Sequence, residues 1–512
     1  MLVKTSSING ACSYISLAII SSLSMACASI SPTGKNLEDE DHSLHGTEFH
    51  LGSFGEPKRV THSTRGSATI ESGAGLLGKT VVIDPLVRPF STIKALYGVT
   101  LKSAGGFLER TFIEKVRFPK LENNPVPDLS DAAAMDLEAW ENHLDELTSR
   151  ESSSGRIHLL VDGDEYFSRL VTSIATAEES IDIRTYIYDN DDVSLEVSDL
   201  LRARSDEVEI KILVDGLADL FATRLDSSSM PEDTNLPASI SRYLTYASKI
   251  EFRKQSNPWF TGDHAKITVI DQNMAFLGGM NIGREYRYDW HDLMMQVDGP
   301  IVRQLQYEFD QAWAKSGWMG DLAWLKTAIE GYEIDNSGEG YPIRVLSTSI
   351  HDSELYRAQL AAIRRARNHI YIENAYFSDD KILFELARAR RRGVDVRVIL
   401  ASHGDSGILN LSNQKAINTM LRNGIRVYNY PGMTHVKAAV YDGWACLGSA
   451  NFDKLSLQVN QEINLGTSHP AFVAELLERV FYPDFANSIE LRKPLPILNR
   501  HHFAELIADE FL

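Results

Sequence analysis

Two segments of the chain repeat a histidine followed two residues later by a lysine. The first begins HAKITVID, with His264 and Lys266, and the second begins HVKAAVYD, with His435 and Lys437. Side chains two residues apart on a β-strand point to the same face, so each pair can reach one ligand. An imidazole with a pKa of about 6.5 can act as nucleophile, acid or base at neutral pH, and an ammonium group holds an anion. The pairs predict catalysis on an anionic substrate such as a phosphodiester.

Each segment also carries an aspartate, Asp271 or Asp442, where the first strand of a hairpin ends. Asp442 is followed by Gly443, a pair typical of a tight turn between two strands. Asp271 lies an odd number of residues beyond Lys266, which on an ideal strand places it on the opposite face. We group both aspartates with the candidate catalytic residues, although this geometry favours a salt bridge or turn anchor over contact with the substrate.

Small residues and an asparagine end each hairpin and complete a candidate phosphate site. Gly279 and Ser449 belong to pairs of small residues that let the backbone approach a phosphate closely. Asn281 and Asn451 can donate hydrogen bonds from their amides.

Two acids, Asp292 and Glu462, follow the two histidines at nearly equal distances. The second hairpin is one residue shorter between its aspartate and its glycine, which accounts for the difference. The two acids are therefore equivalent positions and not incidental carboxylates.

The elements that must position these residues also repeat. Strand-like runs, separated by helical stretches, recur at 180–188 and 208–216, and again at 369–377 and 394–404. Strands that alternate with helices and contain continuous Val, Ile and Leu runs indicate an α/β fold with a largely internal sheet. We predict two homologous half-domains, 151–330 and 331–512.

The paired segments resemble the H-x-K-x4-D motifs, with trailing small residues and an asparagine, that define the phospholipase D superfamily. The resemblance covers roughly residues 151–490, and the segments 290–302 and 448–465 are most similar to bacterial cardiolipin synthases and related phospholipases. It implies two phospholipase D-type halves, each a β-sheet flanked by helices, related by a pseudo-two-fold axis. Both motifs would meet in one active site.

The resemblance also implies a mechanism. One histidine attacks phosphorus and forms a phosphohistidine while the other protonates the leaving alcohol. By family analogy His264 is the nucleophile and His435 the acid and base. The lysines and asparagines would hold the non-bridging oxygens, and Asp292 and Glu462 would each orient a histidine. We expect no metal and no cofactor, because ammonium groups replace the cation of a metal phosphodiesterase.

Glycerophospholipids are the leading substrate class, cleaved by phosphatidyl transfer, as in a cardiolipin synthase, or by hydrolysis, as in a phospholipase D. A nuclease of the same superfamily and a non-catalytic lipid-binding member are the alternatives. The net charge of -19 over 512 residues counts against a nucleic-acid partner, because affinity for its phosphates comes from clustered Lys and Arg. The membrane surface is the expected partner, and the sequence leaves the oligomeric state open.

Residues 1–30 resemble an export signal, with Lys4 before the apolar run 14–23 and small residues around Cys27. Cys27 is similar to the lipidated cysteine of a bacterial lipoprotein, whereas Ala-Cys-Ala around it suits ordinary signal cleavage. An uncleaved membrane anchor is a third alternative. We predict an exported protein of the cell envelope, membrane-associated or periplasmic, with a polar linker over 31–66.

Residues 67–150 form an N-terminal extension with a basic amphipathic segment. Over 85–120, seven Lys or Arg stand against two acids, and apolar residues recur at mostly helical spacing. Such a segment can lie on anionic lipid. Packing on the main body, with its charges in solvent, is the alternative.

Overall fold

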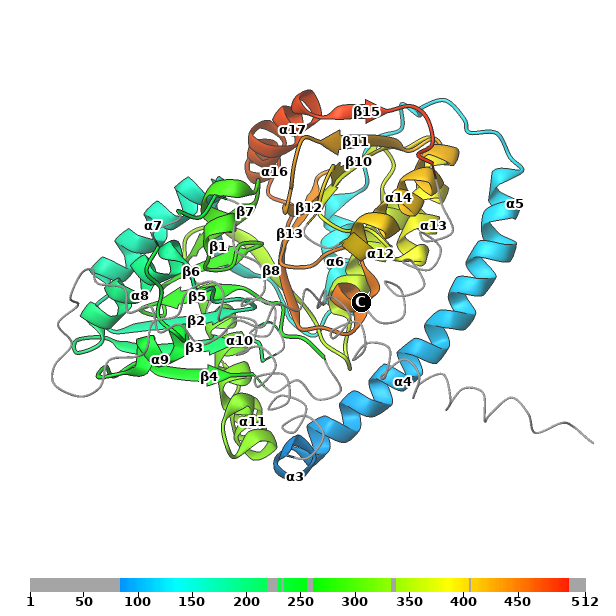
Figure 1. The fold of residues 1–512 in the computed structure, drawn as a ribbon. Helices are drawn as coiled ribbons and strands as arrows, with labels where there is room; N and C mark the ends of the chain where they lie inside the picture. Colours follow the sequence, from blue (N-terminus) through cyan, green and yellow to red (C-terminus); the bar gives the residue numbers. More distant parts are fainter. Residues whose placement is uncertain are drawn as a thin grey trace, which may run out of the picture. The chain divides into compact units, whose positions relative to one another are not determined.

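The protein is described from a computed structural model (Figure 1). The described residues are 83–216, 218, 229–231, 234–255, 261–332, 338–404 and 407–496. The predicted signal or anchor and the polar linker lie outside the described residues.

The first half begins at β1 and alternates strands with helices. Its strands are β1 (Ser153–Val161), β2 (Ser180–Thr185), β3 (Glu209–Val214), β4 (Glu251–Lys254), β5 (Ile267–Ile270), β6 (Met274–Gly278) and β7 (Leu293–Asp298). Its helices are α7 (Asp162–Thr176), α8 (Asp192–Arg204), α9 (Ile240–Thr245), η6 (Glu285–Asp289), α10 (Val302–Ser316) and α11 (Gly320–Glu330). All six residues of β2 are buried, as expected for a strand covered on both faces.

The second half repeats this order from β8. Its strands are β8 (Tyr341–Thr348), β9 (His369–Asn374), β10 (Asp395–Ala401), β11 (Arg426–Tyr430), β12 (Lys437–Tyr441), β13 (Trp444–Gly448), β14 (Glu462–Thr467) and β15 (Ile489–Leu491). Its helices are α12 (Glu354–Arg365), α13 (Asp380–Arg390), α14 (Gly407–Arg422), α15 (Lys454–Gln458), α16 (Pro470–Leu476), η7 (Leu477–Phe481) and α17 (Tyr482–Asn487).

The strand order is mirrored about the pair β8 and β1, which run antiparallel. From β8 outward the order is β14-β13-β12-β9-β10-β11-β15, and from β1 outward it is β7-β6-β5-β2-β3-β4. In both halves an antiparallel hairpin (β5–β6 or β12–β13) lies between the strand that begins at or just after the motif acid (β7 or β14) and a set of parallel strands. The predicted α/β fold, with sheets flanked by helices, is confirmed. The pseudo-two-fold axis and the boundary at residue 330 stay predictions.

One apolar cluster takes residues from both halves. It includes Val269 and Leu277 of the first hairpin, Val440 and Leu447 of the second, and Phe481 of η7. Full burial of an aliphatic or aromatic side chain of this size contributes about 1.5–3 kcal/mol. The halves therefore share a core, which holds the two motif hairpins against each other.

The N-terminal extension packs mainly on the second half, and its beginning also contacts the first half, where Arg88 donates to Lys315 O and Phe90 N donates to Asp321. Its helices are α3 (Asp84–Val87), α4 (Pro89–Phe112), η3 (Ile113–Arg117), α5 (Phe118–Glu122) and α6 (Leu137–Leu147). Trp140 of α6 meets Trp444 of β13 edge to face, with ring centroids 5.0 Å apart. Asp136 caps α6 by accepting a hydrogen bond from Ala139 N. Among the described helices, none combines the length and apolar character needed to cross a membrane.

Candidate active site

The two hairpins place the motif residues at corresponding positions. β5 pairs with β6 and β12 with β13, both antiparallel. His264 and His435 lie just before the first strand of each hairpin, and each lysine follows two residues later. Lys266 and Lys437 are both buried. The catalytic roles of these four residues stay predictions.

Each histidine is hydrogen-bonded to an acid from the other half. His264 Nδ1 lies 2.9 Å from Glu462 Oε1, and His435 Nδ1 lies 2.6 Å from Asp292 Oδ2. Both acids are fully buried. An ionised carboxylate only accepts hydrogen bonds, so it keeps the proton on Nδ1 and leaves a lone pair on Nε2. The structure thus contains two His–acid dyads, and each of them crosses between the halves.

Backbone hydrogen bonds hold both dyads in register. His264 N donates to Gln461 O at 2.9 Å, and His435 N donates to His291 O at 2.6 Å. Gln461 and His291 immediately precede the two acids in the chain. The crossing segments are therefore positioned by main-chain contacts as well as by the dyads themselves.

Gly279 and Ser449 lie against the two acids. Ser449 Oγ donates to Glu462 Oε2 at 2.6 Å. A Cβ at Gly279 would overlap the carboxylate of Asp292, so only glycine leaves room for that acid. Both residues therefore support the carboxylates that contact the histidines, and phosphate binding by either residue stays a prediction.

The two lysines bracket the dyads with positive charge. Lys266 Nζ donates to His264 O at 2.7 Å, and Lys437 Nζ donates to His435 O at 2.7 Å. Burial lowers the pKa of Lys266 to about 7, and Lys437 adds to this shift while Glu462 opposes it. Each lysine Nζ is therefore held beside its own histidine.

Both imidazoles are biased towards their neutral forms. Burial, aided by the charge of Lys437, lowers the pKa of His435 to about 4, although Asp292 opposes the shift. Burial also lowers the pKa of His264, against the opposing effect of Glu462. A neutral imidazole with its proton on Nδ1 presents Nε2 as a nucleophile or base.

Aromatic rings line the dyads. The ring of Tyr186 lies 4.8 Å from that of His264. Trp290 and Tyr286 lie 5.2 Å and 5.8 Å from the ring of His435. Sequence analysis did not identify these three aromatics as part of the site, because strand and loop aromatics are more often core residues. The one sequence signal for Trp290 was its position two residues before Asp292.

The two asparagines differ in their contacts. Asn281 Oδ1 accepts from Thr185 Oγ1 at 3.1 Å and from Ile187 N at 3.0 Å, and its amide donates to Tyr286 Oη at 2.7 Å. Asn281 thus ties the end of β2 to the site. Asn451 Oδ1 is buried and accepts no hydrogen bond from the described residues. A phosphate contact by either amide stays a prediction.

Asp271 and Asp442 anchor turns at the far end of the hairpins. Asp442 accepts hydrogen bonds from four backbone N–H groups, those of Met135, Arg367, Asn368 and His369. Asp271 accepts from the N–H groups of three consecutive residues, 178 to 180. Both residues have positive φ, 49° and 52°. These contacts make both residues turn anchors, the role that strand geometry favoured, and their grouping with the catalytic residues stays a prediction.

Two clusters of described residues have side chains of the kinds that bind metal ions. One consists of His291, Glu373 and Asp484, with candidate ligand atoms within 4.8 Å of one another. Both ring nitrogens of His291 already contact carboxylates, Asp162 at 2.7 Å and Asp484 at 3.1 Å. The imidazolium therefore supplies the positive charge of this cluster.

The second cluster consists of Asp189, Asp191 and Glu285. Asp191 Oδ1 caps α8 by accepting from Ser194 N at 2.7 Å. Neither cluster includes a residue of the two dyads.

Comparison with known proteins agrees with this geometry. Residues 170–313 and 360–482 match the family described as cardiolipin synthase, PLD-like domain. Cardiolipin synthase B of Salmonella typhi is 30% identical over 326 residues, which cover 60% of this chain and 76% of that protein. Cardiolipin synthase 1 of Bacillus cereus is 28% identical over 354 residues, covering 65% and 67% of the two chains.

The crystal structure of phosphatidylserine synthase from Haemophilus influenzae Rd KW20 has a similar fold. It matches with a TM-score of 0.55 at 14% identity and covers 72% of this chain and 97% of that one. The family match spans more than half of the chain and includes both motif histidines. The chain therefore belongs to the phospholipase D superfamily of enzymes, within its cardiolipin synthase family.

Proposed function

We propose that the chain is a phosphatidyltransferase that acts on glycerophospholipids through a phosphohistidine intermediate. The observation that carries the proposal is the pair of dyads, His264–Glu462 and His435–Asp292, each formed between the halves. A two-step displacement at phosphorus needs one nucleophile and one acid–base group on opposite sides of the substrate. Two equivalent imidazoles, one from each half, suit these two roles.

In the first step His264 Nε2 attacks phosphorus, and the bond from phosphorus to the leaving oxygen breaks. His435 gives its proton to that oxygen. The pKa of His435 is about 4 in the free protein. The negative charge of a bound phosphodiester favours the protonated imidazole, so substrate binding supplies the acid. Lys266 and Lys437 hold the non-bridging oxygens.

In the second step an acceptor hydroxyl attacks the phosphohistidine. His435 takes the proton from the acceptor, and the bond from phosphorus to His264 Nε2 breaks. A second phosphatidylglycerol as acceptor gives cardiolipin, with glycerol released in the first step. Water as acceptor gives phosphatidic acid. Glu462 stabilises the imidazolium that His264 becomes whenever it is protonated or phosphorylated.

The test uses the full-length protein with phosphatidylglycerol vesicles in EDTA, with lipid products followed by mass spectrometry. We expect cardiolipin and glycerol from the wild type and from His158→Ala, whose side chain is exposed, and none from His264→Ala. Phosphatidic acid alone would replace transfer with hydrolysis. Equal turnover in His264→Ala would contradict the phosphohistidine. Cleavage of DNA without any lipid product would overturn the lipid assignment in favour of a nuclease.

We further propose that the protein is exported and works at the cell envelope, against or attached to a membrane. The pattern of residues 1–30 and the position of Cys27 support this location. Cell fractionation of the wild type and of Cys27→Ser tests it. Release of the variant from membranes would assign lipidation at Cys27, whereas a protein found in the cytoplasm would contradict export.

A further inference from the structure

Helix α4 presents apolar side chains outward, where a helix on a globular protein ordinarily presents polar ones. Phe90, Ile93, Tyr97 and Leu101 recur at three- and four-residue spacing, which places them on one face. Their side chains are between 52% and 67% exposed. These four residues are called the α4 stripe.

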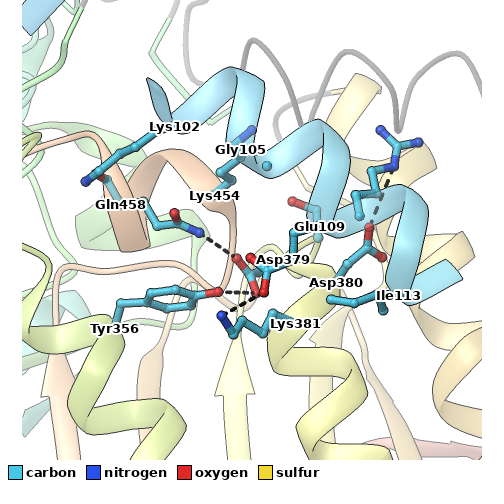
Figure 2. A pocket seen from close by; sticks show the side chains of 13 residues that line it. Lys102, Gly105, Glu109, Ile113, Tyr356, Asp379, Asp380, Lys381, Lys454 and Gln458 are labelled. Atoms are coloured by element: carbon cyan, nitrogen blue, oxygen red, sulfur yellow. Dashed lines mark hydrogen bonds and ion pairs between the residues drawn. The ribbon is translucent and has the colours of Figure 1, made fainter. Parts of the chain in front are cut away.

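The opposite face of α4 contacts the body of the protein mainly through polar groups. Lys102 Nζ donates to Gln458 O and, at 3.0 Å, to Ser353 Oγ. Glu109 pairs with Lys381 at 2.7 Å. A cavity of about 260 Å³ lies between α4 and the second half, and Figure 2 shows Lys102, Glu109 and Lys381 among the side chains around it. Among the described residues, the body therefore leaves more than half of the surface of each α4 stripe side chain exposed.

A second stripe lies along α11. Trp318, just before the helix, is followed at helical spacing by Leu322, Leu325 and Ile329. These four side chains are between 48% and 84% exposed. Scattered surface leucines are normal, but two regular stripes of large apolar residues on neighbouring helices mark an interaction surface.

The two helices are fixed to each other at their N-terminal ends. Asp321 of α11 accepts hydrogen bonds from the backbone N–H groups of Phe90 and Ser91, at 2.9 Å and 3.1 Å. Farther along, Lys94 of α4 lies over the ring of Trp324 at 5.7 Å. The stripes are therefore parts of one rigid unit and not of two independent segments.

We propose that the α4 and α11 stripes together form a docking surface for a bilayer that contains anionic phospholipid. The charge of the extension complements such a bilayer, because Lys94 of α4, Lys115 of η3 and Lys120 of α5 are exposed. Amphipathic helices that bind lipid combine this basic character with large apolar and aromatic side chains. The proposal rests on the proposed function to the extent that the substrate lies in the same bilayer.

The docking surface is connected to the active site through α4. Gln458, whose carbonyl accepts from Lys102, lies four residues before Glu462 of the first dyad. The segment between them pairs with the chain before His264, where Gly262 N donates to Asn460 Oδ1 at 2.9 Å. A protein held on a membrane by α4 would thus carry the rim of its catalytic site close to the lipid headgroups.

The test compares Tyr97→Glu/Leu322→Glu with the control Ile489→Glu, which alters an equally exposed residue of β15. Binding of the full chain to vesicles of phosphatidylglycerol and phosphatidylcholine is measured by flotation. We expect at least tenfold weaker binding for the double variant and unchanged binding for the control. Turnover of detergent-dispersed phosphatidylglycerol should be unchanged in both. Equal binding by the two variants would overturn the proposal.

A second measurement excludes attachment by the N-terminal residues alone. Quenching of fluorescence by brominated phosphatidylglycerol is compared in wild type and Trp318→Phe, and the difference reports Trp318. Quenching of Trp318 supports docking, whereas vesicle-bound protein with unquenched Trp318 contradicts it. A dimer in solution that Leu322→Glu dissociates, with vesicle binding unchanged, would assign the surface to a second copy instead. Because neither measurement needs turnover, a protein that docks but makes no lipid product would sink only the proposed reaction.

Discussion

Asp292 Oδ2 lies 2.6 Å from His435 Nδ1, although 143 residues separate the two in the chain. The acid comes from the first half and the histidine from the second. The counterpart dyad, His264 with Glu462, crosses in the opposite direction over 198 residues. Neither half therefore contains a complete dyad, and each motif histidine depends on an acid of the other half.

Asp292→Asn should abolish most activity while leaving the fold intact. A neutral amide cannot stabilise the imidazolium that His435 must form, and it no longer enforces the proton on Nδ1. We expect kcat/KM to fall roughly 10²- to 10⁴-fold, as for the acid of a catalytic triad. Turnover of dispersed phosphatidylglycerol and thermal unfolding are measured together. Asp298→Asn, at the far end of the strand that follows Asp292 and more exposed, should behave as wild type, and equal losses in both variants would refute the dyad.

Ser449→Ala tests the role of the hydrogen bond between Ser449 and Glu462. The substitution removes the hydrogen bond to Glu462 and leaves a buried carboxylate less well paired. We expect a loss of about 1 kcal/mol in transition-state stabilisation, or roughly fivefold in kcat/KM. KM should change little, because Ser449 would not touch substrate. A large rise in KM with kcat unchanged would instead indicate that Ser449 binds the substrate phosphate.

Asp442→Asn should reduce stability and spare catalysis. Asparagine tolerates the positive φ of this turn. Its amide NH2 group, however, cannot accept hydrogen bonds, so some of the four backbone N–H groups that now donate to Asp442 would lose their acceptor. We expect the free energy of unfolding to fall by about 2–3 kcal/mol. Asp271→Asn should cost less, since Asp271 anchors a more exposed turn with three donors. Chemical denaturation measures the free energy of unfolding of both variants. A loss of kcat without a loss of stability would indicate that Asp442 is a catalytic residue.

His291→Gln tests the ion cluster behind the second dyad. Burial alone lowers the pKa of His291, but the hydrogen bonds that it donates to Asp162 and Asp484 raise the pKa to about 12. The unfolded residue titrates at about 6.5, so its stabilising charge is fully present below that pH and is lost as pH rises towards 12. The stability advantage of wild type over the variant should shrink by roughly 1–2 kcal/mol between pH 6.5 and pH 8.

Wild type and His291→Gln must be compared with each other, because Lys266 changes the pH dependence of stability in the opposite direction to His291. Its pKa of about 7 lies below its ordinary value, so its contribution rises with pH in the alkaline range. Both proteins share that contribution, and it cancels in the difference. An advantage that stays constant from pH 6.5 to pH 8 would mean that His291 is neutral in the folded protein.

The sequence predicted the elements that local pattern determines. The strands at 180–185, 369–374 and 395–401 formed where the apolar runs indicated, and the turn at Asp442 formed where Asp-Gly predicted it. Strand periodicity also placed Asp271 away from the substrate side. These features depend on a few neighbouring residues, so a single sequence contains them.

The features that the sequence did not predict depend on contacts between distant segments. The equivalence of Asp292 and Glu462 was visible, but no local pattern says that each acid pairs with the histidine of the other half. From the sequence, Gly279 and Ser449 suited a phosphate site, and only the fold shows that they lie against the carboxylates of Asp292 and Glu462. Met135, far from either motif, donates to Asp442 because the extension folds onto the second half.

The measurement that tests the central claim most directly uses a phosphatidyl ester with p-nitrophenol as leaving group. This alcohol leaves without a general acid, so His435→Ala should release one equivalent of p-nitrophenol in a burst and then stall. Mass spectrometry of the quenched variant should find the phosphatidyl group on the peptide that contains His264, and His264→Ala should give neither burst nor adduct. An adduct on His435, or a burst that survives in His264→Ala, would contradict the account.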